Sequence, residues 1–115
     1  MSVLIDYKVE LFNKVNLGKG LSTKDQMLTS VIFDHYNIRK ANQLLDDICN
    51  ILSGISLEIA IPTPSLYLIE ISLSTTKIYD DGHAWEEDNN IIPSFTLPTV
   101  DFKIIVEAWR DYITQ

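Results

Sequence analysis

The sequence has one cysteine, Cys49, so no disulfide can form within the chain. It also has no run of 18 apolar residues, and its first residues alternate apolar with charged side chains instead of forming the basic and apolar blocks of a signal peptide. We therefore expect a soluble, cytoplasmic protein that folds in a reducing compartment and has no membrane partner.

Basic residues are scarce in the second half of the chain. Residues 1–57 hold six basic and six acidic residues, so the whole net charge of −7 arises after residue 57. Within that half, residues 79–90 (YDDGHAWEEDNN) carry five carboxylates and no lysine or arginine. Such a negative field repels nucleic acid and attracts a basic partner. We therefore expect no nucleic-acid partner.

Motifs for catalysis and cofactor binding are also lacking. The glycines of NLGKGLSTK do not have the spacing of a phosphate-binding loop, and there is no GxSxG nucleophile motif. Cys49 is expected on the apolar face of a helix, where a thiol acts as a small hydrophobe. His35, beside Asp34, is either an acid–base group held by a carboxylate or a partly exposed residue at a helix end, and we favour the second interpretation. The sequence predicts neither an enzyme nor a cofactor.

The length and an ordinary composition, 46% hydrophobic and 22% charged, predict one globular domain over residues 1–115. Period-two alternation predicts a strand over residues 3–11, and the polar, glycine-containing residues 13–22 predict a surface loop. Thr23 and Gln26 fit a capping box that starts a helix, which we favour, although β-branched residues leave a strand possible over residues 23–36. An apolar stripe predicts a second helix from Asn37 that ends at Gly54.

Apolar alternation predicts an antiparallel strand pair over residues 55–61 and 66–74, with the second strand running on towards Tyr79. Pro93 would place residues 91–97 at a sheet edge or in a bulge. Thr99 is expected to cap a last helix in which Lys103 pairs with Glu107. The fold class is α+β: a single domain with an antiparallel sheet of about four strands packed against two or three helices.

The acidic residues 79–90 allow three interpretations. His83 with Asp80, Asp81 or Glu86 would make a metal site, but the glycine and the carboxylates do not follow the spacing of a calcium loop. A solvated loop that aids solubility is the plainest interpretation. Trp85 favours the third, a docking surface, because a tryptophan beside carboxylates either folds back into the core or forms an interface anchor.

The C-terminal stretch LPTVDFKIIVEAWRDYI has a threonine followed by an F-x-x-I-x-x-x-W-x-x-Y-I pattern. In this respect the chain resembles immunity proteins of bacterial contact-dependent growth inhibition and related polymorphic toxin systems. The matching residues are Thr99, Phe102, Ile105, Trp109, Tyr112 and Ile113. The resemblance implies a protein that binds its cognate toxin domain, often a basic nuclease, and blocks it without catalysis.

The resemblance carries over no contact residues, so the predicted toxin-binding set comes from the acidic segment. It comprises Asp80, Asp81, His83, Trp85, Glu86, Glu87 and Asp88. The alternative function is a small metal-dependent enzyme or metal-binding domain that uses the same carboxylates and His83. A third alternative is self-association through exposed strand edges.

Overall fold

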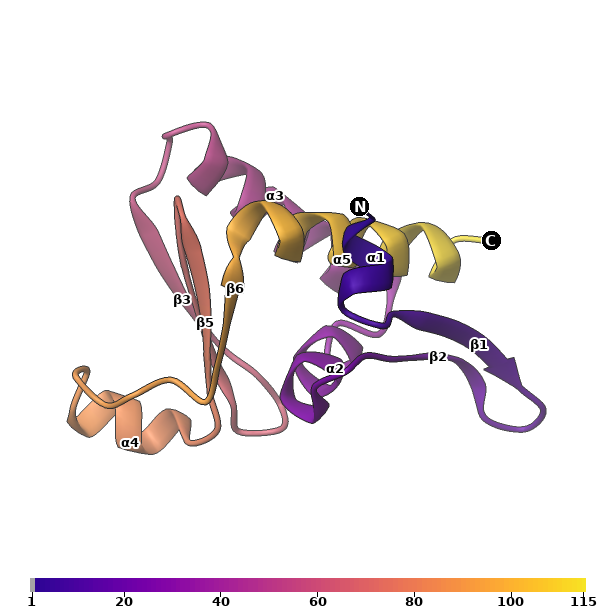
Figure 1. Ribbon diagram of the computed structural model, residues 1–115, viewed down its shortest axis with the longest axis horizontal. Helices are drawn as coiled ribbons and strands as arrows, with labels where there is room; N and C mark the ends of the chain where they lie inside the picture. The colour runs from indigo at the N-terminus through magenta and orange to yellow at the C-terminus, as the bar shows by residue number, and fades with distance from the viewer. Residues whose placement is uncertain (1) are drawn as a thin grey trace.

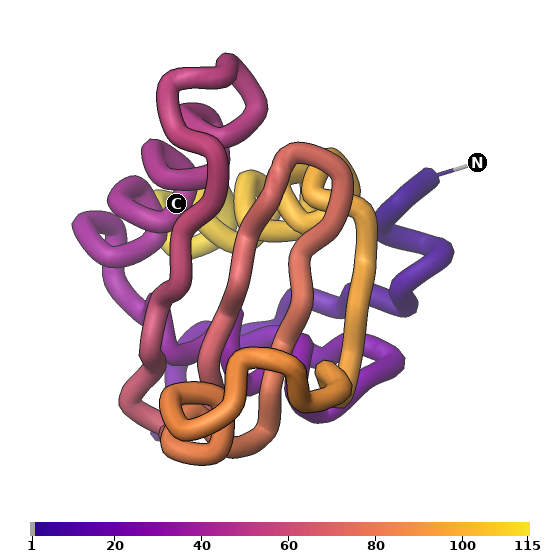
Figure 2. The backbone as a smooth tube through the Cα atoms, turned by 90° about the vertical axis from the view of Figure 1, so that its left-hand side faces the viewer, coloured from indigo at the N-terminus to yellow at the C-terminus, as the bar shows by residue number. Residues whose placement is uncertain are grey.

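The computed structural model describes residues 2–115 and shows a four-stranded antiparallel sheet with helices behind it and a separate two-stranded hairpin (Figures 1 and 2). The strands of the larger sheet lie in chain order and are β3 (Glu58–Pro62), β4 (Leu68–Ser72), β5 (Thr75–Tyr79) and β6 (Phe95–Pro98). The predicted α+β class is therefore confirmed. None of the helices within residues 2–115 combines the length and the apolar character needed to cross a membrane.

One face of the larger sheet is covered by α3 (Ile38–Leu52) and α5 (Thr99–Ile113), which lie behind the strands in Figure 2. The predicted apolar stripes of both helices supply much of the core, and Trp109 of α5 is almost fully buried. Alternate residues of β4 and β5 face these helices, so Ile69, Ile71 and Ile78 are buried while their neighbours point to the other face.

The prediction for α3 is confirmed at both ends. The Asn37 side chain accepts a hydrogen bond from the Lys40 backbone N–H at 2.8 Å, and Gly54, just beyond the helix, has a φ of +84°. The break between two helices is also confirmed, because α2 (Gln26–Phe33) stops before Asp34. The cap of α2 differs from the prediction. Asp25 caps it by accepting from the Met27 and Leu28 amides, so Thr23 is not the cap.

The predicted strand over residues 3–11 is wrong. The chain forms a short helix α1 (Val3–Asp6), and β1 (Glu10–Lys14) begins only after Lys8 adopts a φ of +52°. The apolar residues split between the two elements. The apolar residues of α1 follow a helical spacing, and those of β1 follow a strand spacing. Read together along the chain, the two spacings have the same pattern as one continuous alternating strand. The Tyr7 hydroxyl donates to Asp101 at 3.0 Å and ties this segment to α5.

The predicted loop over residues 13–22 is also wrong, because β1 and β2 (Gly18–Ser22) form an antiparallel hairpin. Asn16 and Gly18 have positive φ angles at its turn. A side chain at position 18 would be strained in this conformation, which explains the glycine there. The hairpin projects from the body of the molecule at the end opposite α4 (Gly82–Glu87) (Figure 1). The two ends lie along the longest dimension of the molecule, 42 Å.

The paired strands β3 and β4 are confirmed, with Ile59 opposite Ile71, but β4 does not run on towards Tyr79. The chain turns at Leu73 and Ser74 and returns as the antiparallel strand β5. The turn contains neither glycine nor proline, so the usual signal was missing. The segment after Pro93 supplies β6 at the sheet edge, as predicted.

Three side-chain expectations remain. The Lys103–Glu107 pair is confirmed, with Nζ and Oε2 3.5 Å apart. Cys49 is exposed, so its predicted apolar position is wrong. Thr99 is the first residue of α5 rather than its cap. Its buried hydroxyl donates to the Ser72 carbonyl at 2.6 Å and accepts from the Thr76 hydroxyl at 3.0 Å, which ties α5 to the β4–β5 turn.

Replacing Thr99 by valine should lower the free energy of unfolding by about 1–3 kcal/mol, because the Ser72 carbonyl and the buried Thr76 hydroxyl lose their partner. Denaturant titration measures the change. The exposed Thr96→Val on neighbouring β6 is the matched control and should shift stability by less than about 0.5 kcal/mol. Equal effects of the two variants would contradict the buried hydrogen-bond network.

Candidate functional site

The acidic segment is not a loop, because its centre folds into helix α4. The Asp81 carboxylate accepts a hydrogen bond from the Ala84 amide at 3.0 Å and so caps the first turn. The Gly82 N–H donates to the Leu66 carbonyl at 3.0 Å, and a Cβ on Gly82 would lie 3.3 Å from that oxygen. The glycine therefore lets the start of α4 lie close against the β3–β4 connection.

Trp85 points inward, and its predicted role as an outward anchor has no support. Its ring packs on Tyr79 with centroids 6.3 Å apart and planes inclined at 49°. The indole Nε1 is buried and has no hydrogen-bond partner within residues 2–115. The tryptophan therefore packs α4 against the end of β5, and its indole N–H is not exposed on the surface.

This brace holds α4 across one end of the sheet face that the large helices leave open (Figure 2). The Tyr79 hydroxyl on that face donates to Glu70 Oε1 at 3.3 Å, and Lys77 Nζ lies 4.0 Å from the same oxygen. Burial raises the pKa of Tyr79, and the negative charges of Glu70 and Glu58 raise it further. The phenol therefore stays a neutral donor near neutral pH.

The seven predicted residues divide into three groups in the structure. Asp80, His83, Glu86 and Glu87 are exposed on or beside α4, and Glu86 lies 3.9 Å from His83. Asp81 and Asp88 are also exposed, but each serves the backbone, since Asp88 Oδ1 accepts from the Asn90 amide. Trp85 packs on Tyr79 on the inner side of α4 and so holds the helix that carries the exposed residues. The segment is thus an ordered acidic surface, not a set of converging catalytic groups.

Sequence reasoning missed Glu58 and Glu70, which extend this surface across the sheet. Both alternate with residues that face the helices, so their side chains lie on the open face beside Tyr79. The period-two pattern of these strands could have indicated that face. It could not place the strands next to α4, because the turn at Leu73 was unrecognised. Hereafter the acidic face means Glu58, Glu70, Asp80, Asp81, Glu86, Glu87 and Asp88.

The metal interpretation has no geometric support. Within residues 2–115, no three histidine, cysteine, aspartate or glutamate side chains lie close enough together to hold a metal ion. His83 and Glu86 are one helical turn apart on an exposed face, and Asp81 is engaged as a cap.

His35 lies in a separate cavity of about 160 Å³ between the α2–α3 turn and β3, also lined by Asp34, Lys40 and Asp47. Its Nδ1 is 2.8 Å from the Val31 carbonyl, so this nitrogen carries the proton. Burial lowers the pKa of His35, and Lys40 lowers it further, while the Val31 carbonyl, Asp34 and Asp47 oppose the shift. The backbone carbonyl of His35 accepts from Trp109 Nε1. The residue is a half-buried part of the turn, in line with the favoured prediction.

No protein-family model matches this chain, and no curated protein or solved structure matches it either.

Asp81→Ala should destabilise α4 by roughly 1 kcal/mol, the usual cost of a lost helix cap. Faster hydrogen exchange of the Ala84 amide is the expected readout. Asp81→Asn should keep the cap, so the Ala84 amide should exchange as slowly as in the wild type. Asp80→Ala removes a neighbouring charge without touching the cap and should also leave this exchange rate unchanged. If Asp80→Ala accelerated exchange as much as Asp81→Ala, charge and not capping would hold the helix.

The lowered pKa of His35 predicts a loss of stability in mild acid. The folded protein favours the neutral imidazole, so this contribution is complete above the ordinary pKa of 6.5 and is lost as pH falls from there towards the folded-state pKa. His35→Gln should flatten the stability curve just below pH 6.5 in urea titrations. The matched control is His83→Gln, which replaces an exposed imidazole on α4 and leaves the α2–α3 turn intact. Parallel curves for wild type and His35→Gln would contradict a buried neutral imidazole.

Proposed function

We propose that this protein is an immunity protein that neutralises a basic toxin domain by docking the acidic face against it, without catalysis. The single observation that carries the proposal is the ordered presentation of Glu86 and Glu87 on a short helix that is capped and braced from beneath, with Asp80 exposed just before it. The resemblance of the C-terminal helix to immunity proteins supports the same class of function.

The charge of this face supports a basic protein as partner. Seven carboxylates lie on it, and within the described residues Lys77 is the basic side chain beside them, paired with Glu70. A concentrated negative field speeds the approach of a positively charged partner and disfavours nucleic acid. Side chains whose backbone is already ordered lose less conformational freedom on binding than those of a flexible loop.

The mechanism is substrate mimicry by charge. A toxin that cleaves nucleic acid must hold phosphates in a basic cleft, and exposed carboxylates on α4 take the place of those phosphates. Glu86 and Glu87 enter such a cleft, while Trp85 and Tyr79 keep the helix rigid below them. Blocking the cleft excludes the substrate, so the immunity protein needs no catalytic residue of its own.

Reversing the exposed charges should slow association. The double variant Glu86→Lys and Glu87→Lys changes the net charge from −7 to −3. We expect its association rate constant with the proposed basic toxin domain to fall roughly ten-fold or more at low salt, because steering is lost. Stopped-flow fluorescence measures the rate, and loss of growth protection in cells that express the toxin is the functional readout.

The matched control is Asp6→Lys with Glu10→Lys, two exposed carboxylates far from α4 that give the same net charge of −3. The control should keep nearly the wild-type rate and protection. Equal losses for both double variants would show that overall charge governs binding, and no loss for either would remove the acidic face as the docking site.

A further inference from the structure

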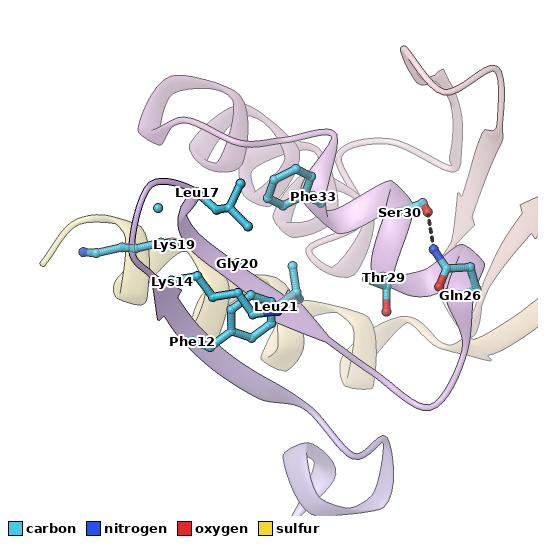
Figure 3. Close-up of a pocket in the computed structure, with 11 residues that line it drawn as sticks. Phe12, Lys14, Leu17, Lys19, Gly20, Leu21, Gln26, Thr29, Ser30 and Phe33 are labelled. Carbon is cyan, nitrogen blue, oxygen red and sulfur yellow. Dashed lines mark hydrogen bonds between the residues drawn. The ribbon is translucent and has the colours of Figure 1, made fainter.

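The end of the molecule opposite α4 carries an apolar groove with the reverse charge. The groove lies between the β1–β2 hairpin and the outer side of α2, and its volume is about 430 Å³ (Figure 3). That volume falls in the range of binding sites that take an apolar group of a ligand or a partner. The proposed docking face is at the other end of the long axis, so one partner contact does not account for both (Figure 1).

The groove has an apolar floor and an apolar rim. Gly20 makes the floor, because its missing side chain lets the Phe12 ring lie against the backbone; an added Cβ would come within 2.6 Å of that ring. Phe33 of α2 forms the facing wall and is 47% exposed. Leu17 at the hairpin turn is 79% exposed, and the neighbouring Val15 is 88% exposed. Polar residues normally occupy such a turn, so two exposed aliphatic side chains there indicate a surface that a partner covers.

The charge around the groove is positive. Lys14 and Lys19 line the groove, and no carboxylate is among the residues that line it in the described chain. Lys19 is engaged, since its Nζ donates to the Tyr112 and Gln115 carbonyls at 2.8 and 2.7 Å and so ties the hairpin to the end of α5. Lys14 lies over the Phe12 ring, 5.0 Å from the centroid, and forms no ion pair within residues 2–115. It is the cation available to a ligand.

We propose that this groove binds an acidic amphipathic segment of a second partner protein, with an apolar side chain against Phe12, Leu17 and Phe33 and a carboxylate on Lys14. The occupant follows from charge complementarity, because the groove combines an apolar lining with an unpaired lysine and no acid. A basic toxin would be repelled here, so the segment belongs to a partner other than the one at the acidic face. The inference goes beyond the proposed function. The groove's lining and Lys14 stand without it, and only the statement that the occupant belongs to a second partner rests on the proposed basic toxin.

Three synthetic helical peptides of about 15 residues test the chemistry, a length at which isolated helices begin to form. One has leucines on one face and glutamates on the other, the second replaces the glutamates by lysines, and the third replaces the leucines by serines. Titration of the isotope-labelled full chain is followed by nuclear magnetic resonance. The acidic leucine peptide should shift the amides of Phe12, Leu17, Gly20 and Phe33, and it should bind at least ten-fold more tightly than either of the others.

Two variants locate the site. Leu17→Asp should weaken the acidic leucine peptide at least ten-fold, and Lys14→Glu should weaken it while improving binding of the lysine peptide. Leu57→Asp is the matched control, because this leucine is 90% exposed and lies outside the groove. The affinity of this variant for the acidic leucine peptide should equal that of the wild type. Both leucines are exposed, so the folds should survive, and the dispersion of the amide spectrum checks this.

Equal binding of the acidic and lysine peptides, or amide shifts confined to α4, would overturn the proposal. Light scattering measures whether the protein forms oligomers through the groove. A concentration-dependent oligomer that Leu17→Asp abolishes and Leu57→Asp preserves would make the groove an interface between copies of this chain, and that result would also overturn it.

Discussion

The packing of Trp85 on Tyr79 decides how the acidic segment meets its surroundings. Without it, five carboxylates within a few residues would repel one another and remain a solvated loop. With it, the half-buried inner side of α4 packs against the end of β5, and Glu86 and Glu87 are exposed on an ordered helix. The buried indole N–H has no well-formed hydrogen bond, so the tryptophan stabilises α4 by packing and not by polar contacts.

The larger sheet supplies the rigid base for this arrangement. Tyr79 can receive Trp85 only because the chain turns at Leu73 and brings β5 back beside β4. The buried hydroxyls of Thr76 and Thr99 join that turn to α5, whose apolar side fills the core. The acidic face is thus connected to the best-packed part of the molecule through one strand. The hairpin end, in contrast, is joined to the body through Leu21 in the core and the Lys19 contacts to the end of α5.

Sequence reasoning succeeded where one signal was present and unopposed. The helix α3 has a capping asparagine, a clear apolar stripe and a glycine after its end, so both of its boundaries could be predicted. It failed where two periodicities overlapped, as in α1 and β1, and where a turn lacked glycine and proline, as at Leu73. For the candidate site, composition identified the acidic segment. It could not show which way Trp85 points, because an inward brace and an outward anchor have the same sequence; only the position of Tyr79 decides between them.

The most direct test of the acidic face is a hydrogen-exchange footprint of this protein with and without a basic toxin domain of the kind proposed as its partner. The account predicts slower exchange on binding for the amides of α4 and of β4 and β5, with the hairpin at the opposite end unchanged. Protection confined to the hairpin and α2, with α4 exchanging as in the free protein, would contradict it.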